Sequence, residues 1–272
     1  YVGGHQIDDA AGLRADGYDL NEIAVKLVHN YIRQITVYRF FHADPHPGNI
    51  RVQGGKIIWL DLGMMGRISP REAELYMGII RTIYEQDVPA LEARLRRAQA
   101  GLETLWDEDF GFYCNRRTDT GAFSHRISPT NFYALFDRSV PKARRERIAA
   151  HYWNPEEFYG EWMLPSIARN DPAFPEQDYW RGRVWAPLNF LVYLAFCQHA
   201  DLARERADLA EKSAALFLSE WQENRHIHEN YNAVTGQGCD SANSDKFYHW
   251  GALLGALVMA EKGLLSSLGA DL

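Results

Sequence analysis

Residues 179–193 read YWRGRVWAPLNFLVY, so that a cluster of aromatic and basic side chains runs directly into an apolar segment. From Leu188 to Phe196 the chain is apolar all round, which is typical of a helix buried within a protein. The stretch from Ala203 to Trp221 is amphipathic instead, as expected of a helix with one face towards water. Amphipathic helices next to fully buried ones predict layered helices, as in a helical barrel.

The distribution of tryptophan marks a change of character along the chain. Seven of the eight tryptophans lie at or beyond residue 106, and only Trp59 precedes them. Helical segments alternate in this later part with long, aromatic loops punctuated by proline. We place the change between about Asp87 and Gly101, and we predict two domains, residues 1–94 and residues 95–272.

A carboxylate lies among these aromatic residues. Glu229 sits between a helix predicted to end near Asn224 and the loop Asn230–Gly238. Pyranose faces can stack on tryptophan or tyrosine rings, while sugar hydroxyls need paired donors and acceptors. A carboxylate on a glycine-containing loop at a helix end is well placed to act in a cleft. By the local pattern alone, however, a structural role for Glu229 is the stronger interpretation.

Three phrases carry a family resemblance: YWRGRVWAPLNFLVY, ENYNAVTGQG (residues 229–238) and FYHWGALLG (residues 247–255). In this order they resemble glycoside hydrolase family 63, over about residues 95–272. Its members include processing α-glucosidase I and bacterial relatives that act on mannosylglycerate or on other α-linked glucosides and mannosides. Asn230 favours this family over the related trehalases, where lysine usually follows the glutamate. The resemblance implies inverting hydrolysis on an (α/α)6 barrel without a cofactor.

By that resemblance Glu229 is the general base that activates water. The implied substrate-binding residues are Trp180, Arg181, Trp185, Asp171, Asn230, Tyr231 and Trp250. Inversion also needs a general acid, and the family's acid is an aspartate in an upstream motif that this sequence does not contain. Asp171 and Asp178 are candidate substitutes, which we interpret as substrate-side or structural. We therefore expect a partial barrel, whose uncovered apolar faces favour marginal stability and self-association.

The earlier part of the chain contains a loop rich in turn-forming residues, HADPHPGN (residues 42–49), in which two prolines exclude a regular helix. Ile50–Val52 and Lys56–Leu60 then flank a Gln-Gly-Gly turn, which predicts a β-hairpin. Helical periodicity precedes this region, over Asp19–Phe40. A capping-box pattern at Ser69 predicts a second helix to about Gln86, and a third is expected from near Pro89.

The same loop places Asn49 five residues after Asp44, and Asp61 follows at the far end of the hairpin. Protein kinases use an aspartate near the nucleophile, then an asparagine, then an aspartate on the magnesium ions that bridge the nucleotide phosphates. Magnesium prefers hard oxygen ligands, which Asn49 and Asp61 supply. The spacing therefore favours a phosphate and metal site over a turn with incidental acids.

FFHADPHPGNI (residues 40–50) with WLDLGMMGRIS (residues 59–69) resembles the UbiB-type atypical kinases, associated with coenzyme Q biosynthesis, over about residues 1–90. The resemblance implies a kinase-like C-lobe with Asp44 as catalytic aspartate and with Asn49 and Asp61 as metal and cofactor ligands. His42 is either functional or a structural brace for the loop. Mg²⁺ and ATP are implied, but the small-lobe phosphate loop and lysine are not found. We therefore expect no productive ATP binding, and no kinase or ATPase activity from this chain alone.

The composition argues against a nucleic-acid-binding protein, a membrane-spanning protein and a cysteine metal site. A formal net charge of −7 and a pI near 5.8 argue against a nucleic-acid partner, because nothing would offset a phosphate backbone. The longest apolar stretches, Pro187–Cys197 and Trp250–Ala260, are shorter than the roughly 18 residues of a spanning helix. The three cysteines have no metal-ligand spacing. With no signal-like segment, we expect a cytoplasmic protein, and Tyr1 suggests a fragment.

Three functional hypotheses stay open from the sequence. The first is a mainly α-helical glycoside hydrolase fragment, with a carbohydrate ligand and with Glu229 as base. The second is a UbiB-type atypical kinase or ATPase with a helical appendage. The third is a non-catalytic fusion or assembly product in which neither activity is intact.

Overall fold

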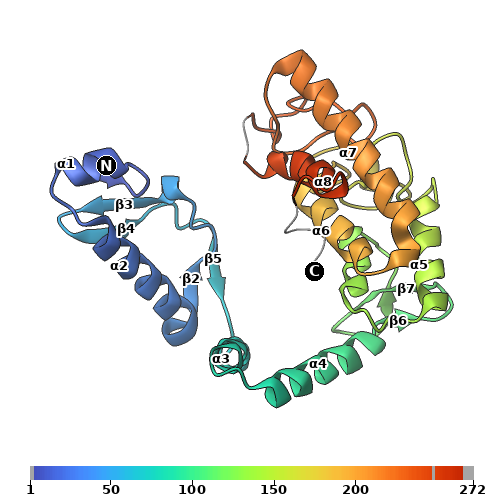
Figure 1. The fold of residues 1–272 in the computed structure, drawn as a ribbon, viewed down its shortest axis with the longest axis horizontal. Coiled ribbons are helices and arrows are strands. Elements are labelled where there is room, and N and C mark those ends of the chain that lie inside the picture. The colour runs from blue at the N-terminus through green and yellow to red at the C-terminus, as the bar shows by residue number, and fades with distance from the viewer. Residues whose placement is uncertain (1–2, 247–248, 266–272) are drawn as a thin grey trace. The chain divides into compact units, whose positions relative to one another are not determined.

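The computed structural model describes residues 3–246 and 249–265, and it forms two compact units, Tyr1–Arg96 and Arg97–Leu272 (Figure 1). Helix α4 (Val88–Glu103) crosses the boundary between the units. Phe247 and Tyr248, which open the phrase FYHWGALLG, lie outside the described residues.

The N-terminal unit contains the predicted hairpin. Strand β3 (Ile50–Gln53) pairs antiparallel with β4 (Lys56–Trp59), and β1 (His5–Gln6) pairs with the other edge of β3. Gly54 and Gly55 connect β3 to β4 with φ angles of 56° and 73°, a left-handed backbone that glycine adopts without strain.

Helices and a second small sheet complete this unit. Asp19 caps α2 (Leu20–Arg33), and its carboxylate accepts the Asn21 N–H at 2.8 Å. The predicted helix over residues 19–40 ends as a π-helical turn, Gln34–Tyr38. The remaining elements are α1 (Ala10–Ala15), β2 (Phe40–His42) paired with β5 (Met65–Arg67), and α3 (Pro70–Tyr84).

Helix α3 begins with the capping box that its sequence predicts. The Ser69 N–H donates to Glu72 Oε2 at 2.6 Å, and the Glu72 N–H donates to Ser69 Oγ at 3.2 Å. Two main-chain donors at the helix start are thereby satisfied. Much of the helix surface beyond the cap is apolar and exposed, and includes Leu75, Ile80 and Ile83.

Layers of helices form the C-terminal unit, with α6 (Ala186–Cys197) packed against α7 (Ala203–Asn224) and α8 (Leu253–Glu261), as Figure 1 shows. A single core of buried aromatic and aliphatic side chains runs through this unit. The other elements are α5 (Lys142–Trp153) and two short hairpins, β6 (Trp106–Asp107) with β7 (Phe112–Tyr113) and β8 (Asn115–Arg116) with β9 (Phe123–Ser124).

The apolar segment of the sequence is the most enclosed helix, α6, and it carries no charged residue. Its fully buried Asn189 is satisfied by main-chain partners. Asn189 Oδ1 accepts the Leu164 N–H at 3.0 Å, and Nδ2 lies 3.0 Å from both the Leu164 and Trp185 carbonyl oxygens. The helix is therefore tied at its start to the loop that precedes it.

Within the described ranges, no helix is both long enough and apolar enough to cross a bilayer.

Candidate functional site

The loop that contains Glu229 follows α7, and isolated β-bridges hold it to neighbouring segments. Helix α7 ends where Arg225 takes a left-handed conformation, with φ of 59°. The Tyr231 N–H donates to the Val184 carbonyl at 3.0 Å, and the Val184 N–H returns a bond to Tyr231 at 2.7 Å. Glu229 therefore lies two residues from a pairing that joins its loop to the segment entering α6.

The Glu229 carboxyl is buried, with 7% of the residue exposed. Its main-chain N–H donates to the Asp245 carbonyl at 2.8 Å, and the Asp245 N–H lies 3.5 Å from Glu229 Oε2. Burial raises the pKa of Glu229, and the Asp245 main-chain bond opposes that rise. A carboxyl group with a raised pKa is a stronger base once it is ionised.

Three tryptophans connect Glu229 to the surface. The Trp250 indole N–H donates to the Glu229 carbonyl at 3.0 Å, and the Trp250 ring meets Trp185 edge-on at 5.8 Å. Trp185 is fully buried and stacks on Trp180 with ring centroids 3.7 Å apart and planes 11° apart. Because Trp180 is 44% exposed, it forms the outer ring of this stack, where a sugar face can pack.

A strained loop presents the stack. Gln177 and Tyr179 both have positive φ, 44° and 50°, which is uncommon for residues other than glycine. Gly182 has φ of 103°, and a Cβ atom there would lie 2.5 Å from the Phe174 carbonyl oxygen. The structure therefore requires glycine at this position of the tryptophan loop, which we define as residues 177–185.

The other predicted sugar-binding residues are occupied by protein partners. Arg181 is ion-paired with Glu176 and with Asp178, the latter at 2.6 Å. Asp171 accepts two bonds from Arg126, at 2.7 and 2.9 Å, and this guanidinium lowers the pKa of Asp171. The roles of Arg181 and Asp171 in substrate binding stay predictions.

Asn230 and Tyr231 are both fully buried. Tyr231 Oη accepts the His228 N–H at 3.1 Å, and burial raises the pKa of Tyr231 to about 12. Asn230 Nδ2 donates to the Asn243 carbonyl at 2.8 Å. These buried contacts fix the conformation of the Glu229 loop. Direct contact of Asn230 or Tyr231 with a sugar stays a prediction.

Sequence reasoning missed two ion pairs next to this loop, each with at least one buried member. Arg183 has no exposed surface, and its Nη2 lies 2.5 Å from Asp240 Oδ1. His228 Nδ1 lies 2.7 Å from Glu220 Oε2, and both residues are buried. Neither pair has a clear sequence signal, because Asp240 is 57 residues from Arg183 and the burial of Glu220 and His228 comes from the tertiary fold.

In the N-terminal unit, the structure gives His42 the geometry of a brace. Its Nδ1 accepts the Asp44 N–H at 3.2 Å, so Nε2 carries the proton and donates to the Leu60 carbonyl at 2.7 Å. The buried ring also stacks on Trp59, with centroids 5.5 Å apart. Between the two open interpretations, these contacts favour the structural one.

The three kinase-type residues gather at one end of the hairpin. Asn49 Nδ2 donates to the Asp44 carbonyl at 3.1 Å, and the Asn49 carbonyl accepts the Leu60 N–H at 2.8 Å, directly before Asp61. Asp61 has φ of 51°, and its Oδ1 accepts the Gly63 N–H at 3.3 Å. With its amide nitrogen engaged, Asn49 has Oδ1 as an oxygen that a cation could bind, and the assignment of Asn49 and Asp61 as magnesium ligands stays a prediction.

Across residues 3–246 and 249–265, no group of three histidine, cysteine, aspartate or glutamate side chains is arranged to hold a metal. The cation site above would depend on an amide oxygen and one carboxylate, completed by phosphate and water oxygens.

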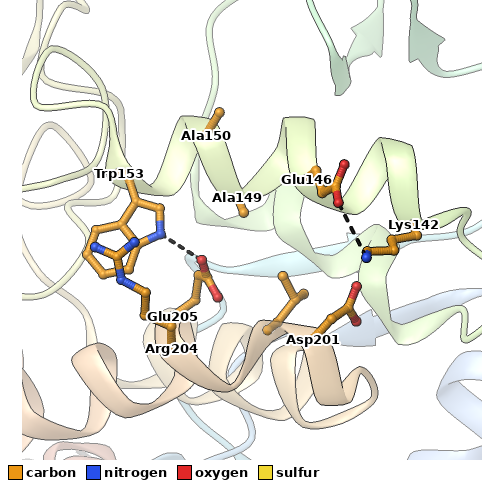
Figure 2. Close-up of a pocket in the computed structure, with 9 residues that line it drawn as sticks. Lys142, Glu146, Ala149, Ala150, Trp153, Asp201, Arg204 and Glu205 are labelled. Carbon is orange, nitrogen blue, oxygen red and sulfur yellow. Dashed lines mark hydrogen bonds and ion pairs between the residues drawn. The ribbon is translucent and has the colours of Figure 1, made fainter.

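Helix α5, the turn Ala200–Leu202 and the start of α7 line a separate, open pocket of about 450 Å³ (Figure 2). Trp153 Nε1 donates to Glu205 at 2.6 Å in its wall, and the Arg204 guanidinium covers the Trp153 ring at 4.1 Å. The pocket contains no residue predicted to bind substrate or metal.

Two family models match the chain. A mannosylglycerate hydrolase MGH1-like glycoside hydrolase domain matches residues 82–250, and an ABC1 atypical kinase-like domain matches residues 1–94. Both predicted resemblances are confirmed. The matches overlap over residues 82–94, and the boundary at residue 94 stays a prediction.

Known proteins resemble the two parts separately. A mannosylglycerate hydrolase of Thermus thermophilus is 28% identical over 229 residues, which is 82% of this chain and 50% of that protein. The chloroplastic protein Activity of BC1 complex kinase 8 of Arabidopsis thaliana is 42% identical over 90 residues, 32% of this chain and 12% of that protein. The chain thus spans about half the length of the first relative and far less of the second.

A solved structure supports the fold. A family 63 mannosylglycerate hydrolase of Thermus thermophilus, in complex with glucose, aligns with a TM-score of 0.53 at 26% identity. The alignment covers 69% of this chain and 45% of that one. Enzymes of this kind have an (α/α)6 barrel, so the predicted mainly α fold class is confirmed.

Proposed function

Because the chain belongs to the mannosylglycerate hydrolase MGH1-like glycoside hydrolase family, we propose that its C-terminal unit binds the hexose of an α-mannoside or α-glucoside. Glu229 is the general base of an inverting hydrolysis in this proposal. The observation that carries it is the burial of Glu229, whose main-chain carbonyl accepts the Trp250 indole N–H, while Trp250 contacts Trp185 and Trp185 stacks on the partly exposed Trp180.

The chemistry follows from the environment of Glu229. The ionised carboxylate takes a proton from water as the water oxygen bonds to the sugar C1, and the bond from C1 to the leaving group breaks on the opposite face. Burial, which raises the pKa of Glu229, strengthens it as a base. The exposed face of Trp180 supplies apolar area for the pyranose ring.

An inverting site also needs an acid about 6.5–9.5 Å from the base. Asp171 and Asp178, the two candidate substitutes, are ion-paired with Arg126 and Arg181. We propose that neither is the acid, and that the described residues form the base side of the site. The chain alone then hydrolyses substrates whose leaving group needs no proton.

Glycosyl fluorides test this proposal, because fluoride departs without protonation by a general acid. The chain is expected to release fluoride from α-mannosyl or α-glucosyl fluoride and to form the β-hexose, observed by ¹H NMR. Glu229→Gln is expected to reduce the rate about 100-fold or more. Glu223→Gln, which changes an exposed glutamate on α7, is the matched control and should leave the rate unchanged. Fluoride release that is unaffected by Glu229→Gln would contradict the proposal.

A second function is favoured by the geometry at Asp44, Asn49 and Asp61. We propose that Asn49 and Asp61 hold the Mg²⁺ of a bound nucleotide, with Asp44 near the phosphoryl acceptor. The ion would neutralise phosphate charge. The chain supplies oxygen ligands for it, and we propose no ATP turnover by this chain alone.

Thermal unfolding with ATP tests the second function. Millimolar ATP is expected to raise the unfolding temperature of the N-terminal unit only when Mg²⁺ is present. Asp61→Asn should abolish this shift, and Asp8→Asn, at an exposed aspartate of the same unit, should not. No magnesium-dependent shift would refute the ligand assignment, and steady ATP turnover that Asp61→Asn abolishes would refute the absence of activity.

A further inference from the structure

We infer that Arg183 is a positioning residue for Glu229, because its guanidinium, neutralised by Asp240, fastens the Glu229 loop to the tryptophan loop. The inference rests on the proposed role of Glu229 as base. Arg183 touches neither substrate nor reacting atoms in this view, and acts through the loop that carries Glu229.

The guanidinium of Arg183 donates to both loops. Nη1 donates to the Gln177 carbonyl at 3.1 Å, at the start of the tryptophan loop. Nε donates to Asn230 Oδ1, beside Glu229, and Nη2 donates to Asp240 Oδ1 at 2.5 Å. Nη2 also lies 3.5 Å from the Gln237 carbonyl oxygen. One planar group therefore fixes the spacing between the tryptophan stack and the Glu229 loop.

The contact with Asn230 continues through both the main chain and the side chain of Asn243. Asn230 Nδ2 donates to the Asn243 carbonyl at 2.8 Å, and Asn243 Nδ2 donates to Asp178 Oδ1 at 2.7 Å. Asp178 is itself a residue of the tryptophan loop, where it is ion-paired with Arg181. Both ends of this network lie in the tryptophan loop, so Asn230 is held from two sides.

The Asp240 carboxylate compensates the positive charge of the buried Arg183 side chain. Burial alone would raise the pKa of Asp240, but bonds from Arg183 and Asn232 outweigh it and lower that pKa. The pair formed by the buried Arg183 and the more exposed Asp240 also sets the charge near Glu229. The charged groups that act on Glu229 are Asp245, which raises its pKa, and Arg183, which lowers it against the larger effect of burial.

The test measures the pKa of Glu229 by NMR on the full chain labelled with ¹³C-glutamate, with Glu229→Gln assigning the signal. Arg183→Met, which removes the charge, is expected to raise the Glu229 pKa. Arg183→Lys, which retains it, should restore the wild-type value to within about 0.3 unit. Asp240→Asn, which leaves Arg183 uncompensated, should shift the Glu229 pKa downwards. A purely structural role predicts no such opposite shifts.

Fluoride release adds a kinetic readout. Arg183→Lys is expected to lower kcat about tenfold with KM within about twofold, because it retains the charge but not the planar fork. The matched control is Arg145→Met, which breaks another arginine–aspartate ion pair, the one with Asp201, and should leave kcat and the Glu229 pKa unchanged.

Unchanged Glu229 pKa in Arg183→Met and Asp240→Asn, with folding retained, would overturn the inference. If Arg183→Met does not fold, Arg183→Lys and Asp240→Asn decide the question. The titration of Glu229 does not depend on catalysis. The proposed function fails by a different result, namely fluoride release that Glu229→Gln does not change.

Discussion

At the residue scale, Glu229 combines burial with a charge that its proposed role requires. Its raised pKa means that the folded state favours the protonated carboxyl. The stability from this group is fully present below its ordinary pKa of 4.5 and is lost as pH rises through the higher folded pKa. At neutral pH the ionised carboxylate therefore destabilises the fold, a cost that is common at active sites.

We expect Glu229→Gln to stabilise the C-terminal unit at pH 7 by about 1 kcal/mol, because a neutral amide replaces a buried charge of similar shape. The gain should vanish near pH 4, where the wild-type carboxyl is protonated. Urea unfolding at both pH values measures the difference. A gain of equal size at pH 4 would show that the carboxylate charge is not its cause.

At the element scale, one side chain ties α6 to the loop before it. Asn189→Ala would remove the partners of the Leu164 N–H and carbonyl within a fully buried environment. Because unsatisfied buried main-chain groups are costly, we expect a loss of about 2 kcal/mol in the C-terminal unit. Gln222→Ala on the exposed face of α7 is the control, with a change below about 0.5 kcal/mol. Equal effects of the two variants in urea unfolding would contradict this account.

Elements with local causes were predictable from the sequence. The start of α3 follows from Ser69 and Glu72, and the β3–β4 turn follows from Gly54 and Gly55. The two-residue strands β6 to β9 have too little periodicity to be predicted. The π-helical end of α2 was also missed, because nothing in its spacing separates it from a regular helix.

Some residues of the candidate site were likewise predictable from the sequence, and others depend on the tertiary fold. Glu229 and Trp180 were found through phrases that resemble a family, since the local pattern alone favoured a structural role for Glu229. Arg183 lies inside one of those phrases, but nothing in the local sequence distinguishes it from Arg181. Its importance comes from Asp240 and Asn230, which are 57 and 47 residues away in the sequence. Pairing over such separations is set by the tertiary fold and has no signal in residue spacing.

At the scale of the whole molecule, the two compact units have very different cores. The N-terminal core consists of Leu13, Ile23 and Val52 with a few partly buried neighbours. The C-terminal core is one large cluster of buried side chains that extends from Trp106 to Ala260. Since burial of apolar area is the main favourable contribution to folding, the C-terminal unit should be much the more stable.

We therefore expect two transitions in calorimetry, with the N-terminal unit unfolding at the lower temperature. A hexose that binds at Trp180 should raise only the upper transition, since a ligand stabilises the folded state that it binds, by about 2.7 kcal/mol at 100 times its Kd. Asn189→Ala should lower only that same transition, and Asp61→Asn should leave it in place. A single transition that moves as a whole with hexose and with either variant would mean that the two cores fold as one cooperative unit.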